Sequence, residues 1–145
     1  MAGTVKDVLG KKGKEIWSVS PEATVYEALE VMADKNIGAV LVMEGDRLVG
    51  IFSERDYARK VILQGKSSKD CKVSELMTKE ILYVSPDYPL EACLALMTEE
   101  HVRHLPVMED GKLLGIISIG DVVHEIISSQ KFTISELEKY ILSGG

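Results

Sequence analysis

The chain has 145 residues, of which 46% are hydrophobic and 28% are charged. This balance is typical of an ordinary globular domain and excludes a disordered chain. The formal net charge of −6 argues against a general nucleic-acid binder, because phosphate binding needs a concentrated basic face. The sequence has no run of roughly 18 apolar residues that could span a membrane, and its N-terminus lacks the apolar run of a signal peptide. We therefore expect a cytoplasmic protein without nucleic-acid or membrane partners.

The sequence contains an internal repeat. With an offset of 65 residues, positions 19–59 and 84–124 are identical at 13 of 41 positions without a gap. Ten of the other 28 pairs exchange one apolar residue for another. A single repeat of this length is small for a stable domain, so we expect two copies that share a core. We predict a first repeat with its N-terminal segment at 1–66, a second repeat at 67–128 and a helical tail at 129–145.

The predicted elements begin with a short helical segment, for which Thr4 is a candidate cap. In each copy a short β-segment, at 16–19 and at 81–84, then leads into a Ser-Pro turn. Apolar residues at i, i+4 and i+7 predict that a helix follows. Thr24-x-x-Glu27 is a capping-box pattern at the start of the first of these helices.

Two buried strands joined by a polar turn come next in each copy, and a second helix opens at Ser53 and at Ser118. The strand segments are AVLVM (39–43) and LVGIF (48–52) in the first copy, and LPVM (105–108) and LLGIIS (113–118) in the second. A C-terminal helix uses Ile134, Leu137, Ile141 and Leu142. The predicted fold class is therefore α/β (α+β), with two tandem β-α-β-β-α repeats related by pseudo-twofold symmetry and a C-terminal helix.

One motif ends each copy, as GIFSERD (50–56) and GIISIGD (115–121). Serine followed three residues later by an acidic residue is a helix-capping pattern. The same helix start could instead present N–H groups and the serine hydroxyl to a phosphate, while the aspartate accepts from ribose hydroxyls. The spacing alone does not separate these interpretations. Gly50 and Gly115 indicate a strand irregularity or close packing.

The tandem arrangement, the paired motif and the run RHLPV (103–107) resemble a CBS-domain pair, the Bateman module, over residues 4–128. The resemblance implies a non-catalytic sensor that stands alone and has no obligatory cofactor. It also implies an adenosyl ligand, either AMP, ADP, ATP, NAD or S-adenosylmethionine, bound in a cleft between the repeats. A homodimer and an unidentified regulated protein are the partners that it implies.

The resemblance also assigns the ligand contacts. Ser53 and Ser118 would meet a phosphate, and Asp56 and Asp121 would meet ribose hydroxyls. The early segment of each repeat would form an adenine slot, in which an aromatic side chain either stacks on the base or packs in the core. The slot residues are Ile16, Trp17, Ser18, Ile81, Leu82 and Tyr83.

The two copies differ in charge near this motif. Arg103 and His104 stand where the first copy has Gly38 and Ala39, and Arg55 stands where the second copy has Gly120. We therefore expect two nonequivalent sites, one with Arg103, His104 and the nearby Pro106, the other with Arg55. Each arginine could equally be a solvated surface charge.

Metal binding and catalysis find little support. His101 and His104 have i, i+3 spacing but no third ligand nearby, and Cys71 and Cys93 lack metal-ligand spacing. The sequence has no P-loop, no Gly-x-Ser-x-Gly and no nucleophile with a recognisable base. We expect neither a metal nor an enzyme. The alternatives to a sensor are a constitutive interaction scaffold without a ligand and, less favoured, an enzyme acting on nucleotides.

Overall fold

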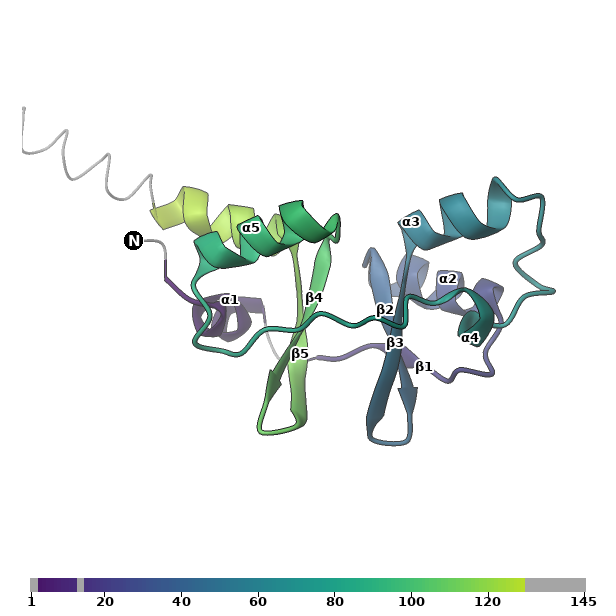
Figure 1. Cartoon of the computed structure of the whole chain (residues 1–145), viewed down its shortest axis with the longest axis horizontal. Coiled ribbons are helices and arrows are strands. Elements are labelled where there is room, and N and C mark those ends of the chain that lie inside the picture. The colour runs from purple at the N-terminus through teal and green to yellow at the C-terminus, as the bar shows by residue number, and fades with distance from the viewer. Residues whose placement is uncertain (1–2, 13–14, 130–145) are drawn as a thin grey trace, which may run out of the picture. The chain divides into compact units, whose positions relative to one another are not determined.

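The computed structural model describes residues 3–12 and 15–129. Helices and short strands alternate along this part of the chain (Figure 1), which confirms the mixed α/β class. The predicted C-terminal helix, with Ile134, Leu137, Ile141 and Leu142, lies outside the described residues.

Packing divides the chain into two compact units. Among the described residues, the first-repeat unit consists of residues 16–81, and the second-repeat unit consists of residues 3–12 and 15 together with 82–129. This division differs from the predicted ranges 1–66 and 67–128, because the segment before each repeat packs into the unit of the other copy. Val5 is buried in the second-repeat core, where its N–H donates to the Tyr88 carbonyl at 3.0 Å. Val73 is buried in the first-repeat core in the same way.

The first-repeat unit is built on a three-stranded sheet in the order β1-β2-β3, with β1 parallel and β3 antiparallel to β2. Val40, Val42 and Phe52 of this sheet are fully buried against the apolar face of α2. The unit's elements are β1 (Ser18–Val19), α2 (Val25–Lys35), β2 (Ala39–Glu44), β3 (Arg47–Ser53), α3 (Glu54–Asp56), the π-helix η1 (Tyr57–Ile62) and α4 (Val73–Leu76).

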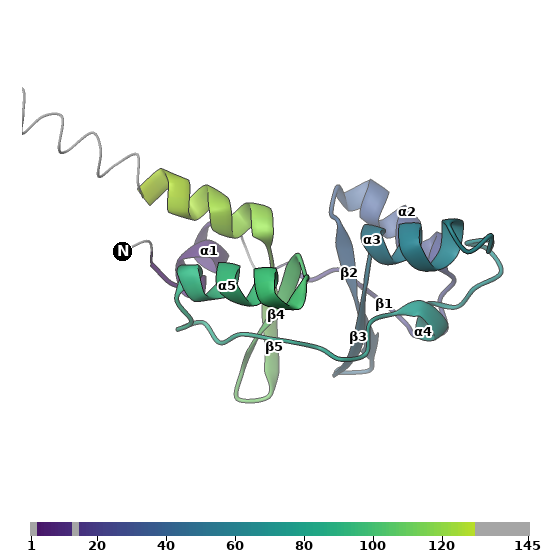
Figure 2. The same cartoon turned by 45° about the horizontal axis from the view of Figure 1, so that its top comes forward.

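The second-repeat unit repeats this plan with fewer strands. Its β4 and β5 form an antiparallel pair, and the early strand predicted at 81–84 is reduced to one parallel bridge between Val84 and Val107. Helix α5 and the helical residues 119–129 lie side by side (Figure 2). The other elements of this unit are α1 (Val5–Lys12), α5 (Leu90–Glu100), β4 (His104–Glu109) and β5 (Lys112–Ser118).

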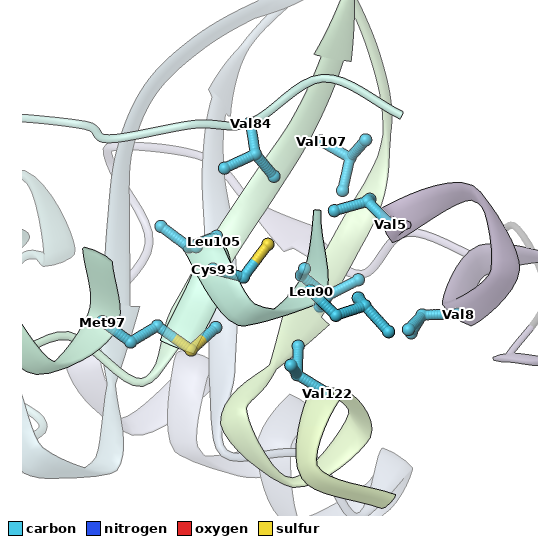
Figure 3. Packing of buried hydrophobic residues seen from close by; sticks show 10 residues of the cluster. Val5, Val8, Val84, Leu90, Cys93, Met97, Leu105, Val107 and Val122 are labelled. Atoms are coloured by element: carbon cyan, nitrogen blue, oxygen red, sulfur yellow. The ribbon is translucent and has the colours of Figure 1, made fainter. Parts of the chain in front are cut away.

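Each helix packs on its sheet through the predicted apolar positions. Met32 and Met97 are 2% and 1% exposed, which confirms their place in the core. Figure 3 shows Met97, Leu90 and Cys93 of α5 in one cluster with side chains from the strands and from α1. The capping box predicted at Thr24 and Glu27 is present at the start of α2.

The two glycines of the motif let a neighbouring side chain approach the sheet. A Cβ on Gly50 would lie 2.8 Å from Met77 Cγ, and one on Gly115 would lie 2.9 Å from Leu9 Cδ2. Both distances are shorter than ordinary van der Waals contacts. The register of each hairpin also shifts beside its glycine, between Val42 and Met43 in the first copy and at the matching place in the second. Close packing and a strand irregularity are therefore both present.

Candidate ligand site

In the first-repeat unit, several predicted site residues meet at one end of the sheet. Ala39, the first residue of β2, pairs with Ser53, the last residue of β3. The Glu54 N–H donates to the Gly38 carbonyl at 3.0 Å, which joins the start of α3 to the start of β2. The Trp17 carbonyl accepts from the Leu41 N–H at 3.2 Å, two residues along β2.

The second-repeat unit brings the matching residues together. His104, at the start of β4, pairs with Ser118, at the end of β5. The Ile119 N–H donates to the Arg103 carbonyl at 2.8 Å, and the Val84 N–H donates to the Pro106 carbonyl at 3.0 Å. Leu82 and Tyr83 come directly before Val84 in this unit, whereas Ile81 belongs to the first-repeat unit.

The Ser-x-x-Asp motif forms the same reciprocal cap in both repeats. The Ser53 N–H donates to Asp56 Oδ2 at 2.9 Å, and the Asp56 N–H donates to Ser53 Oγ at 3.2 Å. The corresponding distances for Ser118 and Asp121 are 2.9 Å and 3.1 Å. The capping interpretation is therefore confirmed, while the ligand role of these residues stays a prediction.

Asp56 accepts further hydrogen bonds from within its own unit. Lys60 Nζ lies 3.0 Å from Asp56 Oδ1, and Thr78 Oγ1 lies 3.3 Å from the same oxygen. Lys60 also donates to the Leu76 carbonyl at 3.1 Å. Neither partner was predicted from the sequence, although Lys60 stands four residues after Asp56 and this spacing on a helix favours an ion pair.

Asp121 has a lysine partner from a different element. Lys12 Nζ, at the end of α1, lies 2.6 Å from Asp121 Oδ2 and 2.9 Å from the Ile116 carbonyl oxygen. The two residues are 109 positions apart in the sequence. No local pattern could therefore have predicted this contact.

The environment of Asp121 keeps its carboxylate ionised. Burial disfavours the charged form and by itself would raise the pKa, but hydrogen bonds from Lys12 and Ser118 outweigh burial. The pKa of Asp121 therefore lies below its ordinary value. At neutral pH this side chain can accept hydrogen bonds and cannot donate them.

The remaining predicted contacts differ in exposure. Arg55, Arg103 and Ser18 are exposed, and Tyr83 is 61% exposed, whereas Pro106 is buried. Trp17 is partly buried, and Lys35 Nζ lies 4.3 Å from its ring centroid. One face of the Trp17 ring is therefore already covered by a cation.

A surface groove of about 510 Å³ adjoins the first-repeat site. It runs between the end of α2 and the start of α3, and Gly38 is the one predicted ligand residue that lines it. This groove was not predicted from the sequence. Its lining residues are Leu29, Met32, Ala33, Asn36, Ile37, Gly38, Glu54 and Tyr57.

Residues 3–12 and 15–129 contain neither a cluster of metal ligands nor a membrane-spanning helix. No three His, Cys, Asp or Glu side chains in these ranges are grouped so that they could hold a metal ion. No helix there is both long enough and apolar enough to cross a bilayer.

The two repeats each match one family model, described as CBS domain, over residues 5–62 and 73–128. The chain belongs to the CBS domain family. The resemblance found in the repeated motif is thereby confirmed, and the matched ranges cover both hairpins and both Ser-Asp caps of this CBS pair.

Relatives of this CBS pair agree with that assignment. CBS domain-containing protein CBSX3, mitochondrial, from Arabidopsis thaliana is 38% identical over 151 residues, which cover 97% of this chain and 73% of the relative. A solved structure of a protein with CBS domains from Burkholderia ambifaria MC40-6 is 49% identical, with a TM-score of 0.84 and coverage of 88% of this chain and 96% of that chain.

A more distant structure was solved with ligands. It is a CBS domain pair in complex with 5′-methylthioadenosine and S-adenosyl-L-methionine, and it is 24% identical to this chain. Its TM-score is 0.73, and the match covers 83% of this chain and 97% of that chain. At this identity, the similarity shows a shared fold alone.

Proposed function

We propose that this CBS pair is a non-catalytic regulatory module that binds an adenosyl ligand at its Ser-Asp motifs and signals to another protein. The ligand is AMP, ADP, ATP, NAD or S-adenosylmethionine. One observation carries the proposal: both units place a partly exposed, capped aspartate beside the end of a β-hairpin. The adenosyl ligands bound by the distant CBS pair support the choice of ligand class.

Each type of site residue contacts the part of the ligand that suits its chemistry. Asp56 and Asp121 accept hydrogen bonds from the ribose hydroxyls, since a carboxylate offers two acceptor oxygens. Ser53 and Ser118 stand at helix starts, where a phosphate is favoured. Arg55 and Arg103 are exposed and make no ion pair with any other residue that the structure describes, so both can reach a phosphate.

The proposal includes a homodimer formed through the second helix of each repeat. Ile62 and Ile127 occupy equivalent positions and are 53% and 44% exposed, and Leu63 is 76% exposed. Large apolar side chains exposed at matching positions favour burial against another copy. Light scattering should show a dimer for the natural protein and a monomer for Ile62→Lys with Ile127→Lys.

The proposed compartment is the cytoplasm. The name of the Arabidopsis relative refers to mitochondria instead. Fractionation of cells that express the tagged full chain distinguishes the two compartments.

Ligand binding is tested by calorimetry after release of any bound molecule. Protein purified without added nucleotide is denatured, and the released small molecules are identified by mass spectrometry. AMP, ADP, ATP, NAD and S-adenosylmethionine are then titrated into the refolded natural chain, Asp56→Asn and Asp121→Asn. Asparagine keeps one oxygen that can accept the capping N–H, so the loss of affinity reports the missing charge together with the missing second acceptor oxygen.

The matched control is Glu27→Gln. This change alters the capping box of α2 in the same chemical way, but Glu27 is outside the predicted ligand set. We expect affinity to fall at least tenfold in one or both aspartate variants and to stay unchanged in the control. If no ligand binds at millimolar concentration, the sensor proposal fails and the interaction scaffold remains.

A further inference from the structure

We propose that Lys12 competes with the adenosyl ligand for Asp121 and so lowers the affinity of the second-repeat half-site. This inference rests on the proposed function, because it needs a ligand whose ribose uses Asp121. Lys12 belongs to α1 and lies outside the predicted set of ligand-binding residues.

The last turn of α1 is held to the helical residues 119–129 by two adjacent lysines. Lys12 Nζ lies 2.6 Å from Asp121 Oδ2, and Lys11 Nζ lies 2.8 Å and 2.9 Å from the two carboxylate oxygens of Glu125. Asp121 and Glu125 are four residues apart and so share one face of their helix. The side chains of Lys12 and Asp121 are 33% and 28% exposed, so solvent reaches this contact.

The acceptor positions of Asp121 explain why a ligand and Lys12 exclude one another. Oδ2 accepts from the Ser118 N–H at 2.9 Å and from Lys12. Each carboxylate oxygen has about two acceptor positions, so these two donors fill Oδ2. A ribose that binds both carboxylate oxygens through its two hydroxyls must therefore replace one of them. The Ser118 bond caps the helix, and so Lys12 is the donor that leaves.

The cost of this displacement is modest. A partly exposed ion pair favours its closed arrangement only a few-fold in water. The apparent affinity falls by the fraction of molecules in which Asp121 is free, so removal of Lys12 should tighten ligand binding about two- to fivefold.

Among the residues that the structure describes, Asp56 makes no ion pair with a separate helix. Asp56 pairs with Lys60 on the following turn of its own helix. The residue equivalent to Lys60 in the second repeat is Glu125, which is the partner of Lys11. A ligand at Asp121 therefore breaks one of the two lysine ion pairs that hold the end of α1, whereas a ligand at Asp56 leaves both ion pairs in place. Binding at the second-repeat half-site thereby changes the protein surface around Lys12.

The experiment uses a neutral probe to separate ribose contacts from phosphate contacts. 5′-Methylthioadenosine, which has a ribose diol and no phosphate, is titrated calorimetrically into full-length Asp56→Asn protein, where only the second half-site keeps its aspartate. Lys12→Gln is added to this background, and Lys11→Gln, which disturbs the neighbouring Glu125 pair, is the matched control. We expect about two- to fivefold tighter binding with Lys12→Gln and no change with Lys11→Gln.

Two further measurements keep the test decisive. Added salt should tighten binding to the protein with Lys12, because salt weakens the competing ion pair, and should leave Lys12→Gln unchanged. Lys12→Arg, which keeps the positive charge, should bind no tighter than the natural residue. If Lys12→Gln does not fold, the salt response and Lys12→Arg decide the question.

Several outcomes would overturn the inference, and they are distinguishable. Unchanged or weaker binding of the probe to Lys12→Gln contradicts competition, although the proposed function survives. Weaker binding of AMP with unchanged binding of the probe makes Lys12 a phosphate contact instead. If the natural chain binds no adenosyl ligand at all, the inference and the proposed function fail together.

Discussion

The two repeats build the same cap around different counterions. Ser53 with Asp56 and Ser118 with Asp121 make equivalent hydrogen bonds of nearly equal length. The lysine beside Asp56 comes from the next helical turn, whereas the lysine beside Asp121 comes from α1. The seven-residue motif therefore has the same local geometry in both repeats. The charges around it differ, because different segments of the chain pack against it in each unit.

The neighbouring carbonyl shows the same contrast. The Ile51 carbonyl accepts from the Thr78 backbone N–H at 2.9 Å, and the equivalent Ile116 carbonyl accepts from Lys12 Nζ at 2.9 Å. In the first-repeat unit the segment after α4 is extended and bridges β3. In the second-repeat unit α1 continues to Lys12 instead. The same acceptor is thus satisfied by a backbone group in one unit and by a side chain in the other.

The largest expected effect tests whether equivalent core positions in the two repeats contribute equally to stability. Phe52 and Ile117 are equivalent and fully buried. Phe52→Ala should lower the free energy of unfolding by about 3–5 kcal/mol, and Ile117→Ala by about 2–5 kcal/mol, because each leaves a cavity. Urea unfolding measures both changes, and Trp17, the single tryptophan of the chain, reports on the first-repeat unit. A Trp17 transition that Phe52→Ala does not move would contradict the assignment of Phe52 to that core.

The second prediction compares the two motif glycines. Gly50→Ala should cost about 1–3 kcal/mol, since the new methyl group overlaps Met77, of which three atoms lie within contact range. Gly115→Ala should cost less, because only Leu9 Cδ2 lies close. The urea concentrations at the unfolding midpoints show which variant is less stable. In a Met77→Ala background, Gly50→Ala should lower the stability less. An equal loss of stability with and without Met77 would contradict this explanation.

The third prediction uses the ionisation of Asp121. Because its pKa in the folded protein is below that in the unfolded chain, Asp121 stabilises the fold above the unfolded pKa of about 4, and this contribution is lost as the pH falls through the folded pKa. Asp121→Asn should cost about 1 kcal/mol at pH 7. Thermal unfolding between pH 7 and pH 2.5 measures the difference in stability between the variant and the natural protein. This difference should become smaller as the pH falls. A difference that stays constant over this range would rule out the ion pair as its source.

The smallest expected effect concerns Cys93. Burial raises the pKa of its thiol to about 11, so only about one thiol in a thousand is ionised at pH 8. Alkylation of Cys71→Ala protein by iodoacetamide should be at least a hundredfold slower in the native state than in urea. Cys93→Ala should cost only about 1 kcal/mol, since the first repeat has Ala28 at this position and buries it fully. Fast native alkylation would show that Cys93 is accessible.

Much of the fold follows from local patterns. The capping box at Thr24, the helix through Met32 and the hairpins beside Gly50 and Gly115 were all predicted, because each rests on residues close together in the sequence. The early strand of the second repeat was predicted too long, since only Val84 forms a bridge there. The π-helix η1 was not predicted, because its i+5 hydrogen bond from Leu63 N–H to the Ala58 carbonyl leaves no pattern in composition.

The sequence by itself determined that the chain is a tandem CBS pair with a Ser-Asp cap in each copy, because the repeat and the cap depend on spacings within a few residues. The tertiary structure alone decided that α1 belongs with the second repeat and that α4 belongs with the first. It also decided which lysine lies beside each aspartate. The contact between Lys12 and Asp121 joins segments 109 residues apart. Burial of Val5, Val8 and Val73, rather than any local preference, brings such distant segments together.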